Sequence, residues 1–276
     1  MVCYYEKVRG KLMAAEFGRT IDPAPIYHTV PRELLTNTGD VVDVMETHHA
    51  SLERAGLGQF GPFSGIYYDV TRRAHRRLEE GGYDCPEVVA AAIPNFAKRW
   101  FDHLLNYADG NRDAIPGIWM LGFEDPAMLA AEPATQFSIG MLGHIDVDLG
   151  KTVYSLGAPR AYKRDYSHHI SDVLIETAEA QSEDLLPVNA LVRYLMTKGV
   201  LQLISAKREL AWQQGKLLMA AGDNVTEREM IEAQVENYGL LSGQLMLYAG
   251  NVALKQAQRF VPAGGLVSTV GRLLGR

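Results

Sequence analysis

FSIGMLGHIDVDL, residues 137–149, is the most informative stretch of this chain. This stretch lies inside an apolar helix that we predict over residues 134–156. The ionisable residues of the stretch are His144, Asp146 and Asp148. Burying such groups without partners costs several kcal/mol, so they must face solvent, pair with partners or line a cavity. His144 and Asp148 share one face of the helix, whereas Asp146 lies about 200° round it and is expected to face elsewhere.

The same His-x-x-x-Asp spacing returns in DYSHHISDVL, residues 165–174. Here it pairs His168 with Asp172. Two such helices packed antiparallel can bring four ligands together around one or two divalent metal ions. Zinc accepts His nitrogen and Asp oxygen with an open position for water, and iron or manganese suits similar sets. The predicted metal ligands are His144, Asp148, His168 and Asp172.

The same segments also predict a polar active site that needs no metal. In that interpretation His144 is a general acid or base, and Asp148 or Asp165 orients it, because a carboxylate fixes the tautomer and pKa of a neighbouring imidazole. The catalytic residues would be His144, Asp148, Asp165 and His169, with His168 and Asp172 as accessory groups.

A purely structural network is the third interpretation. It would pair His144 with Asp165 or Asp172, and Asp148 with Arg160 or Arg164. Arg208 is the best candidate for a buried arginine, and we expect an acidic partner for it.

The rest of the chain is helical in its periodicity, with little strand alternation and no internal repeat. We predict a single all-α domain, a bundle of seven to nine helices over all 276 residues. Residues 1–39 form an N-terminal helix and an irregular connector, 40–258 the helical core, and 259–276 a Gly-rich tail. Pro94 should break or kink the helix that begins near Pro86.

Composition limits the function classes. The net charge of −6 argues against a non-specific nucleic-acid surface. The two cysteines, Cys3 and Cys85, make no disulfide framework, which favours a cytoplasmic protein. The N-terminus does not read as a signal peptide, and no segment is apolar enough to predict a membrane span.

Sequence signatures of nucleotide and dinucleotide binding, of nucleophile elbows and of H-E-x-x-H metal sites are absent, so no nucleotide cofactor is expected. We therefore expect a small-molecule enzyme with its pocket between helices, acting on a hydrophobic, polyketide- or lipid-like substrate. The reaction would be an acid/base-assisted cyclisation, isomerisation or hydrolysis, with or without a metal. The alternative is a non-catalytic helical binding or scaffold protein. Homodimerisation through the long C-terminal helices is compatible with both.

Several segments together resemble a family of all-helical proteins of unknown function. The central stretch MLGHIDVDL, residues 141–149, is similar to that family's N-A-H-I-N-x-D-L helix, with Asp146 where the family has Asn. Stretches beginning at residues 39, 96 and 206 extend the likeness to about residue 220. The resemblance implies an all-helical fold, with His144, Asp148 and Asp165 at the family's polar positions. It supplies no activity, and it does not include His168 or His169.

Overall fold

A helix that is buried on every side forms the centre of the protein. The structure, a computed structural model, describes residues 21–185 and 190–260. The central helix consists of α8 (Pro133–Leu142), the π-helical segment η3 (Gly143–Leu149) and α9 (Gly150–Ser155), which follow one another without a break. Helices on all sides contact it: α4, α5, α6, α11 and α12. A helix that is apolar all round is stable only in such a position.

The surrounding helices, in chain order, are α2 (Ala24–Thr29), α3 (Thr38–Arg54), α4 (Gly61–Glu79), α5 (Pro86–Ala108), α6 (Gly117–Glu124), α7 (Pro126–Leu129), α10 (Ile170–Leu185), α11 (Ala190–Ala220) and α12 (Val225–Phe260). A second π-helical segment, η5 (Asp165–His169), leads directly into α10. Three short 3₁₀ turns, η1 (Gly58–Phe60), η2 (Arg112–Ala114) and η4 (Arg160–Tyr162), complete the described elements.

The all-α prediction is confirmed, since the described residues contain no strand. When continuous segments are counted as one, ten helices are described, and eight of them have eight or more residues. The two short helices are α2 and α7. Helix α2 lies in the segment that we expected to be an irregular connector, while the predicted N-terminal helix and most of the Gly-rich tail lie outside the described residues.

Close packing of the central helix depends on glycines. A Cβ atom at Gly140 would lie 2.5 Å from the ring of Phe63 on α4. One at Gly143 would lie 2.8 Å from the indole of Trp119 on α6. Both distances are shorter than real contacts allow, so the two glycines let aromatic rings lie directly against the helix backbone.

Helix α5 runs through Pro94 without a break, so the first of the two predicted effects of this proline, a break, is not found. An internal proline removes one backbone hydrogen bond and costs about 3 kcal/mol. Burial of Val89 and Ala92 before the proline, and of Ala97 and Trp100 after it, offsets that cost on both sides.

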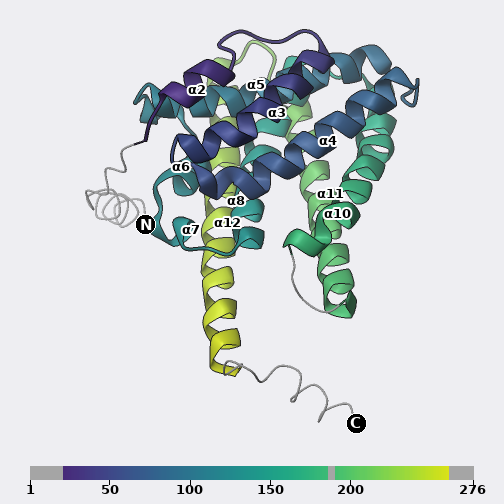
Figure 1. The fold of residues 1–276 in the computed structure, drawn as a ribbon. Helices are drawn as coiled ribbons and strands as arrows, with labels where there is room; N and C mark the ends of the chain where they lie inside the picture. Colours follow the sequence, from purple (N-terminus) through teal and green to yellow (C-terminus); the bar gives the residue numbers. More distant parts are fainter. Residues whose placement is uncertain (1–20, 186–189, 261–276) are drawn as a thin grey trace.

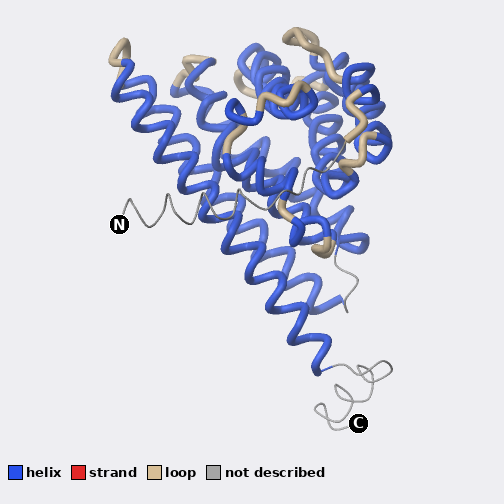
Figure 2. Tube along the Cα trace, turned by 90° about the vertical axis from the view of Figure 1, so that its left-hand side faces the viewer, coloured by secondary structure: helices blue, strands red, loops and turns tan. Residues whose placement is uncertain are grey.

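The long C-terminal helices cover one side of the central helix. Helix α11 packs on α9 and η3, and α12 packs on α6, α8 and η3. Figure 1 shows the C-terminal part of α12, in yellow, running well beyond the other helices, and Figure 2 shows the same from the side. Tyr238, Leu241, Leu245 and Tyr248 are exposed along it. Homodimerisation through these helices stays a prediction.

None of the described helices is long and apolar enough to cross a membrane.

Candidate functional site

Both histidines of the predicted His-Asp pairs lie in π-helical turns, and Asp148 does as well, whereas Asp172 lies in α10. The two turns are η3, with all seven residues buried, and η5, in which Asp165 and Tyr166 are buried. A π-helical turn bonds residue i to i+5 instead of i+4, is rare in proteins and is frequent at functional sites. In η5 the backbone N–H of Ile170 accordingly donates to the carbonyl of Asp165. The π-helical geometry therefore singles out the two segments that carry the predicted site residues other than Asp172.

Asp148 is the centre of a buried hydrogen-bond network. Its Oδ2 accepts hydrogen bonds from His144 Nδ1 at 3.1 Å and Trp119 Nε1 at 3.2 Å. Its Oδ1 accepts one from His103 Nε2 at 2.9 Å. Burial raises the pKa of Asp148, but the two imidazoles outweigh burial and hold the pKa well below its usual range. At 1% exposure, Asp148 is a buried anion held by three donors.

This network fixes the protonation of His144. An ionised carboxylate only accepts hydrogen bonds, so the ring proton of His144 is on Nδ1. Burial lowers the pKa of His144, and Asp148 offsets only part of that shift, so the ring is neutral at pH 7. Its Nε2 therefore carries a free lone pair. That atom is buried and has no hydrogen-bond partner among the described residues.

Aromatic rings enclose the imidazole of His144. The ring of Phe96 stacks on it with centroids 3.5 Å apart, and Tyr67 meets it edge-on at 4.5 Å. Tyr67 and Phe96 also form part of the wall of an apolar cavity of about 80 Å³. Two aromatic side chains thus separate a neutral imidazole from an apolar cavity.

Thr152 connects the network to a cation and to the same cavity. Its hydroxyl donates to the backbone carbonyl of Asp148 at 3.0 Å and accepts from Arg99 Nε at 3.0 Å. Burial lowers the pKa of Arg99, and the charge of Asp148 counteracts this. Thr152 lines the cavity, so the cavity wall is polar at this point.

Asp165 belongs to a different cluster. Its two carboxylate oxygens accept the backbone N–H groups of Asp84, at 2.8 Å, and Cys85, at 2.7 Å. These residues precede α5, so Asp165 caps the beginning of that helix, where a negative charge is favourable. His169 Nε2 lies 3.8 Å from Asp165 Oδ1 and 4.0 Å from Asp84 Oδ2.

Asp84, Asp165 and His169 form the one group of three possible metal ligands among the described residues. Arg164 lies 3.2 Å from Asp84, and both oxygens of Asp165 already accept backbone N–H groups. Helix capping and ion pairing therefore account for this cluster without a metal ion.

The four predicted metal ligands do not come together among the described residues. His168 is exposed, and Asp172 lies 3.5 Å from Arg77 on α4. His144 and Asp148 face α5 and α6 instead, so the two His-Asp pairs do not meet. The pairings expected of a structural network are not formed in the described part of the chain either. Asp148 does not contact Arg160 or Arg164, and His144 does not contact Asp165 or Asp172. His103 and Trp119 donate to Asp148 instead.

Two members of this network, His103 and Trp119, were not among the predicted site residues. His103 lies on the buried side of α5 with Trp100, Leu104 and Tyr107. The sequence signal that could have identified His103 is the presence of an ionisable residue on the apolar face of a predicted helix. Trp119 is fully buried in α6 and donates its indole N–H to Asp148.

Two basic residues of α11 complete the buried polar groups. Asp146 faces away from His144, as predicted, and accepts from Lys207 Nζ at 2.7 Å. Burial raises the pKa of Asp146, and Lys207 lowers it in part. Arg208 is buried, as predicted, but its expected acidic partner is absent: it donates to the backbone carbonyl of Tyr166, and no described carboxylate lies within ion-pair distance.

Fold and site together define an all-α protein with a buried Asp148–His144 centre beside an apolar cavity. The sequence model of a family of unknown function (DUF5995) matches residues 38–248, and the chain belongs to that family. No curated protein matches the chain. No solved structure matches it either.

Proposed function

We propose that the protein is an enzyme in which neutral His144 transfers a proton to or from a small hydrophobic molecule. One observation carries this proposal: Nε2 of His144 is buried and has no partner in the described part of the chain, while Nδ1–H donates to Asp148. A general base needs this arrangement, with one nitrogen fixed by a carboxylate and the other free. Asp148 would stabilise the imidazolium that forms when Nε2 takes a proton.

The energetics of the unpaired nitrogen support a catalytic role. Leaving a buried acceptor without a partner costs about 1–3 kcal/mol. The fold carries this cost at His144 although Asp148 satisfies the other nitrogen. Strained or unsatisfied groups are expected where a residue is kept ready for chemistry.

The cavity indicates the substrate class. Its lining is mostly apolar side chains, with Phe96 and Tyr67 between the space and the imidazole. A volume of about 80 Å³ accommodates a small apolar group and not a whole polyketide or lipid. The apolar part of a substrate would occupy this cavity, and rotation of the Phe96 ring would bring the reacting atom to His144. Cyclisation, isomerisation and hydrolysis are the reactions that such proton transfer serves.

A non-catalytic binding or scaffold protein is the second candidate. The observation that favours it is the enclosure of His144, which is 3% exposed and does not line the cavity itself. In that case the Asp148 network only stabilises the packing of the central helix. The two candidates predict different behaviour of the imidazole toward a small ligand.

Proton exchange of a small ketone tests the proposal. Cyclopentanone in D₂O exchanges its α-protons under general base catalysis, and proton NMR follows the loss of signal. We expect the wild type to exceed the variant His144→Gln by about 10²-fold per site. Because burial lowers the pKa of His144, the rate should decrease at a lower pH than an ordinary imidazole would require.

His48→Gln is the matched control. His48 is also buried with one unpaired ring nitrogen, but its Nε2 accepts from Trp100 and it does not line the cavity. This variant should exchange cyclopentanone at the wild-type rate. Equal rates for the wild type and His144→Gln, with both proteins folded by circular dichroism, would rule out the catalytic role and favour the binding or scaffold function.

A further inference from the structure

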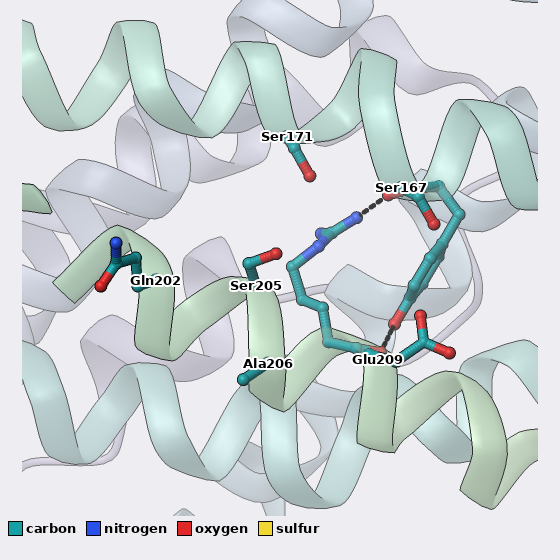
Figure 3. Close-up of a pocket in the computed structure, with 8 residues that line it drawn as sticks. Ser167, Ser171, Gln202, Ser205, Ala206 and Glu209 are labelled. Carbon is teal, nitrogen blue, oxygen red and sulfur yellow. Dashed lines mark hydrogen bonds between the residues drawn. The ribbon is translucent and has the colours of Figure 1, made fainter. Parts of the chain in front are cut away.

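A second, polar cavity of about 450 Å³ lies between η5–α10 and α11. Ser167 and Ser171 face it from one side, and Gln202 and Ser205 face it from α11 (Figure 3). Figure 3 shows the hydroxyl groups of Ser171 and Ser205 directed into the same space from the two helices. Arg208 lines this cavity.

The guanidinium of Arg208 is buried and only partly satisfied. Arg208 is 6% exposed, and one of its terminal nitrogens donates to the carbonyl of Tyr166. Its Nε is buried and has no hydrogen-bond partner among the described residues. The guanidinium also lies over the ring of Tyr166, 4.6 Å from the centroid. No carboxylate in the described ranges, residues 21–185 and 190–260, makes an ion pair with it.

The neighbouring charges leave the cavity positive. Glu209 also lines it, but its carboxylate pairs with Lys163, and this hydrogen bond lowers the pKa of Glu209. Lys207, next to Arg208 in sequence, is neutralised by Asp146. Arg208 is therefore the one charge at this cavity without a counter-ion among the described residues.

The serine hydroxyls are free to act as donors. Elsewhere in the protein, helical hydroxyls such as Ser138 and Thr177 donate to the carbonyl four residues earlier. Ser167, Ser171 and Ser205 make no such bond within the described part of the chain. Three hydroxyl donors thus accompany an arginine that makes no ion pair with any carboxylate the structure describes.

We propose that this cavity binds an oxyanion, a carboxylate or a phosphate group, at Arg208 with the three serine hydroxyls as further donors. A buried charge without a counter-ion is costly, and a bound oxyanion supplies the missing charge. The planar guanidinium fork matches both anions in geometry. This site does not depend on His144 and stands whether or not the protein is an enzyme.

The position of Arg208 also indicates which molecules would carry the anion. Arg208 and Tyr166 line the polar cavity and form part of the wall of the apolar cavity as well. An organic acid with its carboxylate on Arg208 can therefore place an apolar chain toward the apolar cavity. Free phosphate would use only the polar side.

Isothermal titration calorimetry of the full chain with inorganic phosphate, acetate and octanoate, at constant ionic strength, tests the site. We expect one-to-one binding of at least one of them, weakened about 30-fold or more in Arg208→Gln. Arg228→Gln is the matched control, since Arg228 on α12 contacts Tyr154 and does not line the polar cavity. It should bind as the wild type does.

The three ligands distinguish the sources of the anion. Octanoate binding more tightly than acetate assigns the site to organic acids with an apolar chain, and phosphate binding most tightly assigns it to phosphate or a phosphate ester. If Arg208→Gln does not fold, the double variant Ser171→Ala, Ser205→Ala takes its place, with weaker binding as the expected result. Absence of binding by all three ligands at millimolar concentration, or undiminished binding by the folded variants, would overturn the proposal.

Discussion

Replacing Asp148 by Asn tests the buried network at its centre. In the wild type three donors converge on the carboxylate: His144, Trp119 and His103. The amide of Asn has the same shape but only one acceptor oxygen. That oxygen can keep the two bonds now made by Oδ2, so the NH₂ group must face His103 Nε2.

The expected cost follows from this geometry. His103 Nδ1 has no partner, so the ring can change tautomer and accept from the new NH₂ group, at the price of one buried, unpaired N–H. That orphaned donor costs about 1–3 kcal/mol. The two remaining bonds lose their charge-assisted character, which adds about 1 kcal/mol. We expect Asp148→Asn to lower the free energy of unfolding by about 2–4 kcal/mol. Asp148→Ala orphans all three donors and should cost at least about 5 kcal/mol.

Urea denaturation followed by circular dichroism at pH 7 measures these differences. Asp172→Asn is the control: Asp172 is exposed beside Arg77, and its replacement should change stability by no more than about 0.5 kcal/mol. The pKa of Asp148 is depressed in the fold, so its contribution is present above the unfolded value of about 3.9 and is lost at lower pH. A cost below about 1 kcal/mol for Asp148→Asn, or equal costs for Asn and Ala, would refute this reasoning.

Two other buried groups give predictions of the same kind. Burial lowers the pKa of His48 to about 3, so its contribution to stability is complete above the unfolded value of about 6.5 and decreases toward acid. In the variant His48→Gln, the unfolding free energy should therefore depend less steeply on pH between 6 and 4, by about 1.4 kcal/mol per pH unit. Urea titrations at several pH values measure this slope, and an unchanged slope would contradict the prediction. Lys207→Met leaves the Asp146 carboxylate buried without its partner 2.7 Å away. This variant should lose about 3–5 kcal/mol of unfolding free energy. Adding Asp146→Asn to the same chain should recover most of that loss. A double variant as unstable as the single one would show that the ion pair is not the cause.

His144 and Asp148 were found from sequence because their pairing is local. Four residues along a helix bring two side chains to one face, and the pair does meet at 3.1 Å. The same rule failed at His168 and Asp172. Both lie on the outer side of η5–α10, where Asp172 contacts Arg77, so equal spacing along the chain gave unequal burial. Spacing predicts which residues share a face, but not which neighbour that face meets.

The sequence by itself determined that this protein is all-α, that the segment around residue 144 is an apolar helix, and that His144 and Asp148 share one face of it. Helical periodicity and apolar composition are properties of residues close together in the sequence, so they can be recognised without knowledge of the tertiary structure. Only the tertiary structure decided that His103, 45 residues from Asp148, and Trp119, 29 residues away, complete the network. It also decided that Arg208 donates to a backbone carbonyl and makes no ion pair with a carboxylate of the described residues. Those outcomes depend on how helices cross and which faces they bury, and that choice is made by packing over the whole chain.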